Sequence, residues 1–401
     1  MRGKWTVVAS LAVIGFVIGG SGAVAIGLLI TPMMTEFAWS NALTSGMVTA
    51  FNLAGLLAAP GVGIAVDRFG AKPVMIAGAL AMSAGFLSVG LCHTWYLMLA
   101  AFSLAGVGYF SSCYLPVPVV ITSWMGSQKG LGMGLVLGAT SVGAAALSPL
   151  LSWGIAKYGW RPSLGVISAV SALTLPLILA TVRAAPAEPV PTGYRAAEHS
   201  AGRRRRKDDL LSSAFVLVTA SSVLFNVGMG CILYHLVSVL IGDGYSAYNA
   251  GLIYGMTWLL SAVGSLIFGA LADRLGARVI LAGVLLSCAS GIFFLLGAAE
   301  ARVGMVCVIT FTILWGISAN GVSQFVPVVF AEQFGADHLG ALVGVQAGIA
   351  GFASAAAPVV TGALYDTFGD YRPAIYLSAA VTCIAFVLVL MVRPFRRRSS
   401  V

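Results

Sequence analysis

The chain has 401 residues, of which 59% are hydrophobic and only 9% are charged, and its formal net charge is +9 at pH 7. Soluble domains usually carry about 25% charged residues, so this composition excludes a globule whose whole surface faces water. The sequence therefore predicts a protein whose outer surface faces lipid.

Continuous apolar stretches predict an all-α polytopic membrane protein with twelve transmembrane helices. A helix needs about 20 apolar residues to cross the bilayer, and such runs do not alternate as barrel strands do. Helices also satisfy their own backbone in lipid. The first stretch, from Trp5 to about Met34, is too long for a signal peptide and is expected to be retained. The expected spans lie near residues 5–33, 42–66, 73–92, 95–125, 130–156, 161–182, 211–241, 247–271, 279–298, 303–331, 339–364 and 373–393.

One long polar segment divides the chain into two sets of six spans. It contains three prolines and the basic run Arg203 to Lys207, and it has no apolar periodicity. We therefore expect a six-helix bundle over 1–183, a basic linker over 184–210, a second bundle over 211–393 and a tail over 394–401.

Basic residues fall mainly on one side of this arrangement. If the N-terminus is cytoplasmic, 18 of the 22 lysines and arginines lie inside, including the linker and the tail. The positive-inside rule then places both termini in the cytoplasm. A loop near anionic lipid explains the positive charge without nucleic acid.

Several function classes lack the motifs they need. The six cysteines lie in apolar stretches without CxxC spacing, so small buried hydrophobic residues are expected, with no metal or other cofactor. Neither a phosphate-binding GxxxxGK[ST] motif nor an HExxH or Ser/His/Asp set is found. An enzyme, an ATP-driven pump and a receptor with a large soluble domain are therefore disfavoured, and gradients or exchange would supply the energy.

The two halves of the sequence echo each other. The run from Gly63 to Lys72 recurs as the run from Gly269 to Arg278, Pro149 recurs as Pro358, and Trp160-Arg161-Pro162 recurs as Tyr371-Arg372-Pro373. Repeats of this kind build many secondary transporters, with the substrate site between the halves near mid-membrane. The chain is thus predicted to hold two pseudo-symmetric bundles.

The Gly-Asp-Arg-Gly-Lys element resembles the signature between spans two and three of the major facilitator superfamily, with its weaker copy between spans eight and nine. This resemblance covers the whole chain and implies a transporter that works by alternating access. Asp67 would pair with a basic residue or a helix N-terminus and latch the cytoplasmic gate, although a plain loop anchored by Arg68 and Lys72 is the alternative. The gating residues implied are Gly63, Asp67, Arg68, Gly70, Lys72, Asp273, Arg274, Gly276 and Arg278.

A second resemblance is to the monocarboxylate transporter and oxalate/formate antiporter group. It rests on the run from Trp124 to Gly134, on Trp160-Arg161 and on Trp39-Ser40. It implies small organic anions as substrates. Two serines, Ser261 and Ser265, stand where monocarboxylate transporters typically carry an Asp and an Arg, and Leu28 falls near the span-one lysine of some animal members.

Uncharged polar groups therefore form the candidate substrate site. No Asp, Glu, Lys or Arg lies deep in any span, although such groups usually mark function in membranes. Asn226 lies mid-span beside two glycines, and Asn320 and Gln324 lie one turn apart. His235 is the best intramembrane candidate for titration near neutral pH, with a bond to Tyr234 or a backbone carbonyl as the alternative. The expected substrate-binding residues are Leu28, Tyr114, Asn226, His235, Tyr254, Trp258, Ser261, Ser265, Asn320, Gln324 and Gln346; Asn52, Tyr109 and Tyr234 are further polar groups at depth.

The sequence thus predicts a transporter of small organic anions such as monocarboxylates, by proton symport or exchange. An exporter of neutral, hydrophobic or amphipathic compounds is the alternative, because the cavity would be uncharged and aromatic. We expect a monomer in the lipid bilayer of a bacterial inner membrane. Its partners would be a small molecule and, in the symport case, a proton, with no nucleic acid.

Overall fold

The computed structural model describes residues 2–125, 129–182, 212–300, 303–334 and 339–392. Within these ranges the chain is helical, without strands, and twelve helical segments are long and apolar enough to cross a membrane. The predicted all-α fold and its twelve spans are confirmed. The linker over 184–210 and the tail over 394–401 lie outside the described residues.

Several spans consist of more than one helical element. The elements of the first half are α1 (Arg2–Ile14), the π-helix η1 (Gly15–Gly19), α2 (Gly20–Phe37), α3 (Asn41–Phe69), α4 (Ala71–Leu91), α5 (Trp95–Tyr109), the π-helix η2 (Phe110–Tyr114), α6 (Pro116–Met125), α7 (Lys129–Tyr158), α8 (Trp160–Ala172) and α9 (Thr174–Thr181). Those of the second half are α11 (Ser213–Leu233), α12 (Leu236–Gly242), α13 (Ala247–Leu275), α14 (Ala277–Leu295), α15 (Gly304–Ser318), α16 (Gly321–Phe334), α17 (Leu339–Phe368) and α18 (Arg372–Met391).

Glycines end the helices at both copies of the repeated element. Gly70, between α3 and α4, has a φ of 84°, and Gly276, between α13 and α14, has a φ of 86°. Residues with a Cβ rarely adopt this region, whereas glycine does so without steric cost. The two glycines therefore allow the tight turn that joins consecutive spans at each copy of the repeat.

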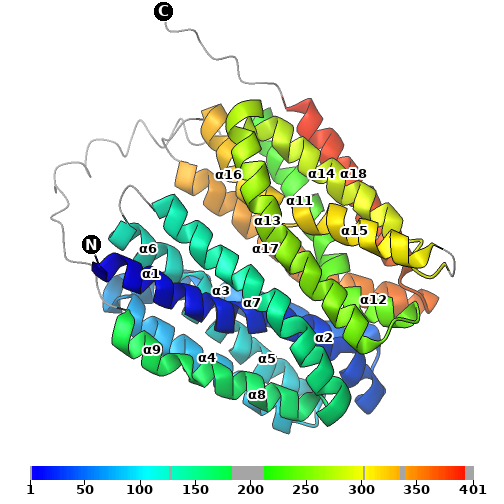
Figure 1. Ribbon diagram of the computed structural model, residues 1–401, viewed down its shortest axis with the longest axis horizontal. Coiled ribbons are helices and arrows are strands. Elements are labelled where there is room, and N and C mark those ends of the chain that lie inside the picture. Colours follow the sequence, from blue (N-terminus) through cyan, green and yellow to red (C-terminus); the bar gives the residue numbers. More distant parts are fainter. Residues whose placement is uncertain (1, 126–128, 183–211, 301–302, 335–338, 393–401) are drawn as a thin grey trace, which may run out of the picture. The chain divides into compact units, whose positions relative to one another are not determined.

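The chain divides into two compact units that do not coincide with the two sequence halves. Of the described residues, one unit comprises those within 2–182, 230–262 and 355–374, and the other comprises those within 212–229, 263–354 and 375–392. In the first unit, α4 packs against α5 and α8 (Figure 1), and α7 packs against α2. In the second unit, α14 packs against α15 and α16. The first unit thus includes the ends of several helices from the second half.

Candidate functional site

Two spans of the first unit are interrupted by π-helices. η1 interrupts the first span and η2 interrupts the fourth, and the two π-helices contact each other. A Cβ added to Gly19 would lie 3.3 Å from the Sγ atom of Cys113, which shows how closely the two segments approach. Single π turns inside α-helices are frequent at functional sites, because they leave backbone groups without their usual partners. No sequence pattern indicated these two turns.

Polar aromatic side chains gather beside η2. The hydroxyl of Tyr234 donates to Oδ1 of Asn52 at 3.3 Å, and Tyr234 is also close enough to Tyr109 and Tyr114 to interact electrostatically with both. Tyr114 is 59% exposed in the middle of its span. We name Asn52, Tyr109, Tyr114 and Tyr234 the tyrosine cluster. Of its members, only Tyr114 was among the predicted site residues.

The first unit also contains an aromatic pair on α13, of which Tyr254 is buried and Trp258 half-buried. Tyr254 is fully buried, and its hydroxyl donates to the backbone carbonyl of Ala23 on α2 at 3.3 Å. The ring of Trp258 lies 6.4 Å from that of Tyr254, and the Ser261 hydroxyl donates to the Trp258 carbonyl at 2.8 Å. These three predicted residues share one helix, and Tyr254 joins it to the first span.

A second set of polar groups lies in the second unit. Nε2 of Gln346 on α17 donates to Oγ of Ser222 on α11 at 2.6 Å, and Nδ2 of Asn226 donates to the Ser222 carbonyl at 2.8 Å. Gln346 and Ser222 are buried, and Asn226 is half-buried. The structure thus brings Asn226 and Gln346 together through a serine. Ser222 could not be singled out from the sequence, because serines are common throughout these apolar helices.

The tenth span is broken where one continuous helix was expected. Asn320 lies in a turn between α15 and α16, whereas Gln324 lies on α16. Nε2 of Gln324 donates to the carbonyl of Ser265 at 3.0 Å, and its buried Oε1 has no hydrogen-bond partner within the described ranges. Gln324 and Ser265 are therefore neighbours, and Gln324 keeps an unused acceptor.

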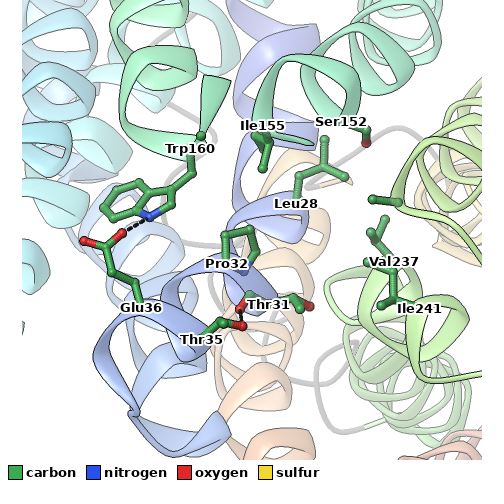
Figure 2. Close-up of a pocket in the computed structure, with 12 residues that line it drawn as sticks. Leu28, Thr31, Pro32, Thr35, Glu36, Ser152, Ile155, Trp160, Val237 and Ile241 are labelled. Carbon is green, nitrogen blue, oxygen red and sulfur yellow. Dashed lines mark hydrogen bonds between the residues drawn. The ribbon is translucent and has the colours of Figure 1, made fainter. Parts of the chain in front are cut away.

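Leu28 lines a cavity of about 370 Å³ in the first unit. Figure 2 shows Leu28, Thr31 and Pro32 on one wall, with Trp160 and Glu36 at one end. The indole of Trp160 donates to Oε2 of Glu36 at 2.5 Å. The remaining wall residues are Thr35, Ser152, Ile155, Gly159, Val237, Ile241 and Ala247. Most of the lining is apolar, and the other predicted substrate residues do not line this cavity.

His235 lies in the break between α11 and α12, not within a continuous helix as expected. It is fully buried, and its Nε2 is 2.9 Å from Oγ of Ser45 on α3. This contact differs from the expected bond to Tyr234 or a backbone carbonyl. Nδ1 of His235 is buried and has no hydrogen-bond partner among the residues that the structure describes.

Two of the basic gating residues, Lys72 and Arg278, donate hydrogen bonds to the carbonyls at helix C-termini. Nζ of Lys72 donates to the carbonyl of Leu179 at 2.6 Å, near the end of α9. Arg278 makes the matching contacts in the second half, donating to the carbonyls of Val389 and Leu390 at 3.2 and 2.6 Å. Cations are favourable beside the orphan carbonyls of helix C-termini. Lys72 and Arg278 therefore each connect the start of one helix to the end of another span.

The acidic gating residues and their neighbours are described only in part. The side chains of Asp67 and Asp273 lie outside the described part of the structure, whereas Arg68 and Arg274 are exposed. Gly63 lies in open space on α3. Glu332, which the sequence did not indicate, accepts a bond from the backbone N–H of Ala277 at 3.2 Å and so caps the start of α14.

The candidate site residues offer uncharged hydrogen-bonding groups. The described residues hold no group of three or more metal ligands, and the span interiors carry no Asp, Glu, Lys or Arg. Tyrosine hydroxyls, amides and indoles donate hydrogen bonds without a fixed charge. The arrangement suits a small polar ligand that needs several weak donors.

The comparisons with known proteins agree with the fold. A model of the Major Facilitator Superfamily matches residues 11–332. The uncharacterized MFS-type transporter YcxA of Bacillus subtilis is 27% identical over 89% of this chain and 86% of its own. Monocarboxylate transporter 12 of Mus musculus is 22% identical over 93% of this chain and 82% of its own. A crystal structure of the nucleoside transporter NupG has a TM-score of 0.80 at 12% identity, covering 96% of this chain and 100% of that one, which shows a shared fold. The chain therefore belongs to the Major Facilitator Superfamily, a family of membrane transporters and not of enzymes.

Proposed function

We propose that the protein carries a small organic anion, such as a monocarboxylate, by alternating access, coupled to a proton or to exchange for a second anion. The observation that carries this proposal is the tyrosine cluster, where the Tyr234 hydroxyl meets Asn52 beside the π turn that ends at Tyr114. The similarity to a protein named monocarboxylate transporter 12 supports the same substrate class.

Neutral donors would hold the anion in place of a fixed cation. Hydroxyl groups and backbone N–H groups freed by broken helices bind carboxylates in transporters of this general build. Each such bond contributes about 1 kcal/mol net, so several weak donors give moderate affinity and fast release. Within the first unit, the site would include the tyrosine cluster and Tyr254.

The alternative substrate is a neutral or amphipathic compound that the protein exports. The observation that favours it is the cavity of about 370 Å³, whose lining is mostly apolar and includes Leu28 and Ile155. Without a cation in the span interiors, such a compound would enter at no electrostatic disadvantage.

We also propose a plasma-membrane location, in a bacterial inner membrane, with both termini in the cytoplasm and the protein as a monomer. The support is the charge distribution, since 18 of 22 basic residues fall on one side of the expected topology. The N-terminal end of α3, at Asn41, would then face the outside of the cell, and its C-terminal end, at Phe69, would face the cytoplasm.

Transport in liposomes tests this function. The purified protein is reconstituted, and uptake of radiolabelled lactate, pyruvate and oxalate is followed with and without a pH gradient, with empty liposomes as the control. Saturable uptake that an acidic exterior accelerates supports proton symport, and uptake that needs an internal anion supports exchange. Absence of saturable uptake by folded protein in both regimes would reject organic anions and favour the amphipathic alternative.

A further inference from the structure

The carboxylate of Asp366 caps the N-terminus of a helix that is distant in sequence. Oδ1 accepts from the backbone N–H of Asn41 at 2.7 Å, and Oδ2 accepts from that of Ala42 at 2.8 Å. Asp366 lies near the end of α17, and Asn41 and Ala42 begin α3. The first N–H groups of a helix lack partners within it, and the helix dipole favours an anion there. Asp366 thus joins the end of one span to the start of another through both its oxygens.

This contact is not needed for α3 to form. Oγ of Ser40 already accepts from the N–H of Leu43 at 3.2 Å, which is the usual local cap. Asp366 is exposed, so water can solvate its carboxylate whenever the two helix ends separate. The contact therefore has the character of a reversible connection between helices.

A buried network of hydrogen-bonded side chains adjoins the Asp366 contact. The side-chain amide of Asn41 donates to the hydroxyl of Tyr371, and the hydroxyl of Ser45 donates to Oδ1 of Asn41 at 3.0 Å. Oγ of Ser45 is in turn 2.9 Å from Nε2 of His235. Asn41, Ser45 and His235 are each 0% exposed. These hydrogen-bonded side chains connect α3 to the turn before α18 and to the break after α11.

The helix backbones at this point approach very closely. A Cβ added to Gly362 of α17 would lie 2.6 Å from Cα of Ala42. Only glycine permits such an approach, so the ends of α3 and α17 are in direct backbone contact here. Three features therefore hold this end of α3 and α17 together: the Asp366 carboxylate, the hydrogen-bonded side chains of Asn41 and Ser45, and the close approach at Gly362.

The internal repeat relates α3 and α17 to α13 and α7. This second pair of helices has no acidic residue at the position that matches Asp366. Lys157 lies eight residues after Pro149 on α7, as Asp366 lies eight residues after Pro358 on α17. Nζ of Lys157 lies over the rings of Trp153 and Tyr158, at 5.0 and 5.2 Å from their centres. A lysine cannot accept bonds from a helix N-terminus, so the charged connection exists in one of the two pairs.

We propose that Asp366 is the charged latch of the outer gate and that it favours the state closed on the outside. This proposal rests on the proposed function, because only an alternating-access transporter opens this end. α3 carries Asp67 two residues before its last residue, and α17 carries Asp366 at the same place relative to its own end. Since α3 starts where α17 ends, the end of α3 and the start of α17 face the opposite side of the membrane. One helix pair thus carries one acid for each gate, and only one of the two is engaged at a time.

Distance measurements between two spin labels test this latch without a substrate. Labels are attached to Tyr96→Cys on α5 and Asn249→Cys on α13, both exposed, after the native cysteines are replaced. The protein is placed in lipid nanodiscs, and pulsed electron resonance gives the populations of short and long distances. Asp366→Asn removes the charge and keeps the size. The matched control is Asp370→Asn, which removes a charge from the same face, where Asp370 pairs with Arg372 at 3.6 Å.

The expected result is a shift of roughly threefold to tenfold toward the long-distance population for Asp366→Asn, as the loss of a charged helix cap predicts. Asp370→Asn should stay within about twofold of the parent. Asp67→Asn should shift the populations the opposite way, and the double variant Asp67→Asn with Asp366→Asn should lie between the single variants.

Two outcomes would overturn the latch, namely an unchanged distribution in Asp366→Asn or an equal shift in Asp370→Asn. If Asp366→Asn does not fold, Asp366→Ser serves as the second variant, because its hydroxyl still accepts one bond but carries no charge. Uptake in liposomes, measured separately, distinguishes this result from failure of the substrate assignment. A clear shift without organic-anion uptake would retain the latch and reject the substrate class.

Discussion

Arg161 and Arg372 occupy matching positions of the internal repeat, but within the described part of the chain Arg161 alone ties its helix to two others. Arg161 forms an ion pair with Glu36 at 2.9 Å and donates to the carbonyls of Gly90 and Cys92 at 2.7 and 3.0 Å. These contacts join the start of α8 to the ends of α2 and α4. Arg372 pairs with Asp370 at 3.6 Å, and both side chains of that pair are more than half exposed.

The first prediction compares these two arginines. Arg161→Ala should lower the free energy of unfolding by about 1–2 kcal/mol, since it removes charge-assisted bonds that are only partly exposed to solvent. Arg372→Ala should change it by less than about 0.5 kcal/mol. Thermal unfolding of the purified variants in the same detergent measures both. Equal losses from the two changes would contradict the assigned contacts.

The second prediction concerns close helix crossings at glycine. A Cβ on Gly264 of α13 would lie 1.8 Å from the carbonyl oxygen of Ile317 on α15, whereas Gly283 on α14 faces open space. Gly264→Ala should therefore cost about 3 kcal/mol through overpacking. Gly283→Ala should be neutral or stabilising, because alanine favours helix by about 1 kcal/mol.

Expression yield and thermal unfolding of these two glycine variants provide the measurement. A well-folded Gly264→Ala protein with unchanged stability would mean that α13 and α15 lie further apart than the structure shows. The corresponding crossing of the first half provides a repeat of the test, because a Cβ on Gly106 of α5 would lie 1.9 Å from the carbonyl oxygen of Phe51 on α3.

Spans were predictable from the sequence because hydrocarbon imposes a length and a composition on each helix. The turns at Gly70 and Gly276 followed from the repeat. The breaks inside spans were not predictable, since the π turn ending at Tyr114 and the turn at Asn320 occur within continuous apolar runs. Contacts between side chains of different helices were not predictable for a similar reason. Nothing in the sequence pairs Ser222 with Gln346, or Ser45 with His235, because hydroxyl groups recur on every face of these helices.

The third prediction separates two amides of the candidate site. Asn226 donates to a carbonyl of its own helix at 2.8 Å, whereas Gln346 bonds Ser222 on another helix at 2.6 Å. Asn226→Ala should reduce transport with little loss of stability. Gln346→Ala should reduce transport and also cost about 1 kcal/mol, since it removes a buried hydrogen bond between α17 and α11.

Initial rates in liposomes and unfolding in detergent measure the two effects on the same preparations. Unchanged transport kinetics in Asn226→Ala would remove Asn226 from the site. Unchanged stability in Gln346→Ala would mean that the contact with Ser222 contributes no net energy.

The fourth prediction tests the tyrosine cluster. Tyr234→Phe removes the hydroxyl that donates to Asn52 and preserves the ring. If this hydroxyl also binds the substrate, KM should rise roughly threefold to tenfold, as the loss of one hydrogen bond predicts, with kcat little changed. Tyr376→Phe on α18 is the control, because Tyr376 is 57% exposed. A KM that is the same in both variants would place the substrate elsewhere.

The last prediction concerns the buried histidine. His235 lies between two helical parts of a span, with Nε2 against Ser45 and the ring of Tyr371 5.7 Å away. Burial raises the pKa of Tyr371 to about 12, so its hydroxyl stays neutral at physiological pH and adds no charge beside the imidazole. The acidic side chain of Asp366 lies next to this network, where it accepts a hydrogen bond from the backbone N–H of Asn41 at the start of α3. When the end of the helices at Asp366 opens, a proton that reaches Nδ1 would bind to the imidazole ring of His235.

The variant His235→Gln tests this role. Glutamine keeps a hydrogen-bond donor and an acceptor for Ser45 but cannot titrate. If His235 carries the coupled proton, this variant should lose accumulation driven by a pH gradient and retain exchange of labelled for unlabelled substrate. If gradient-driven accumulation survives in His235→Gln, the proton travels on the substrate, and His235 serves only the contact with Ser45.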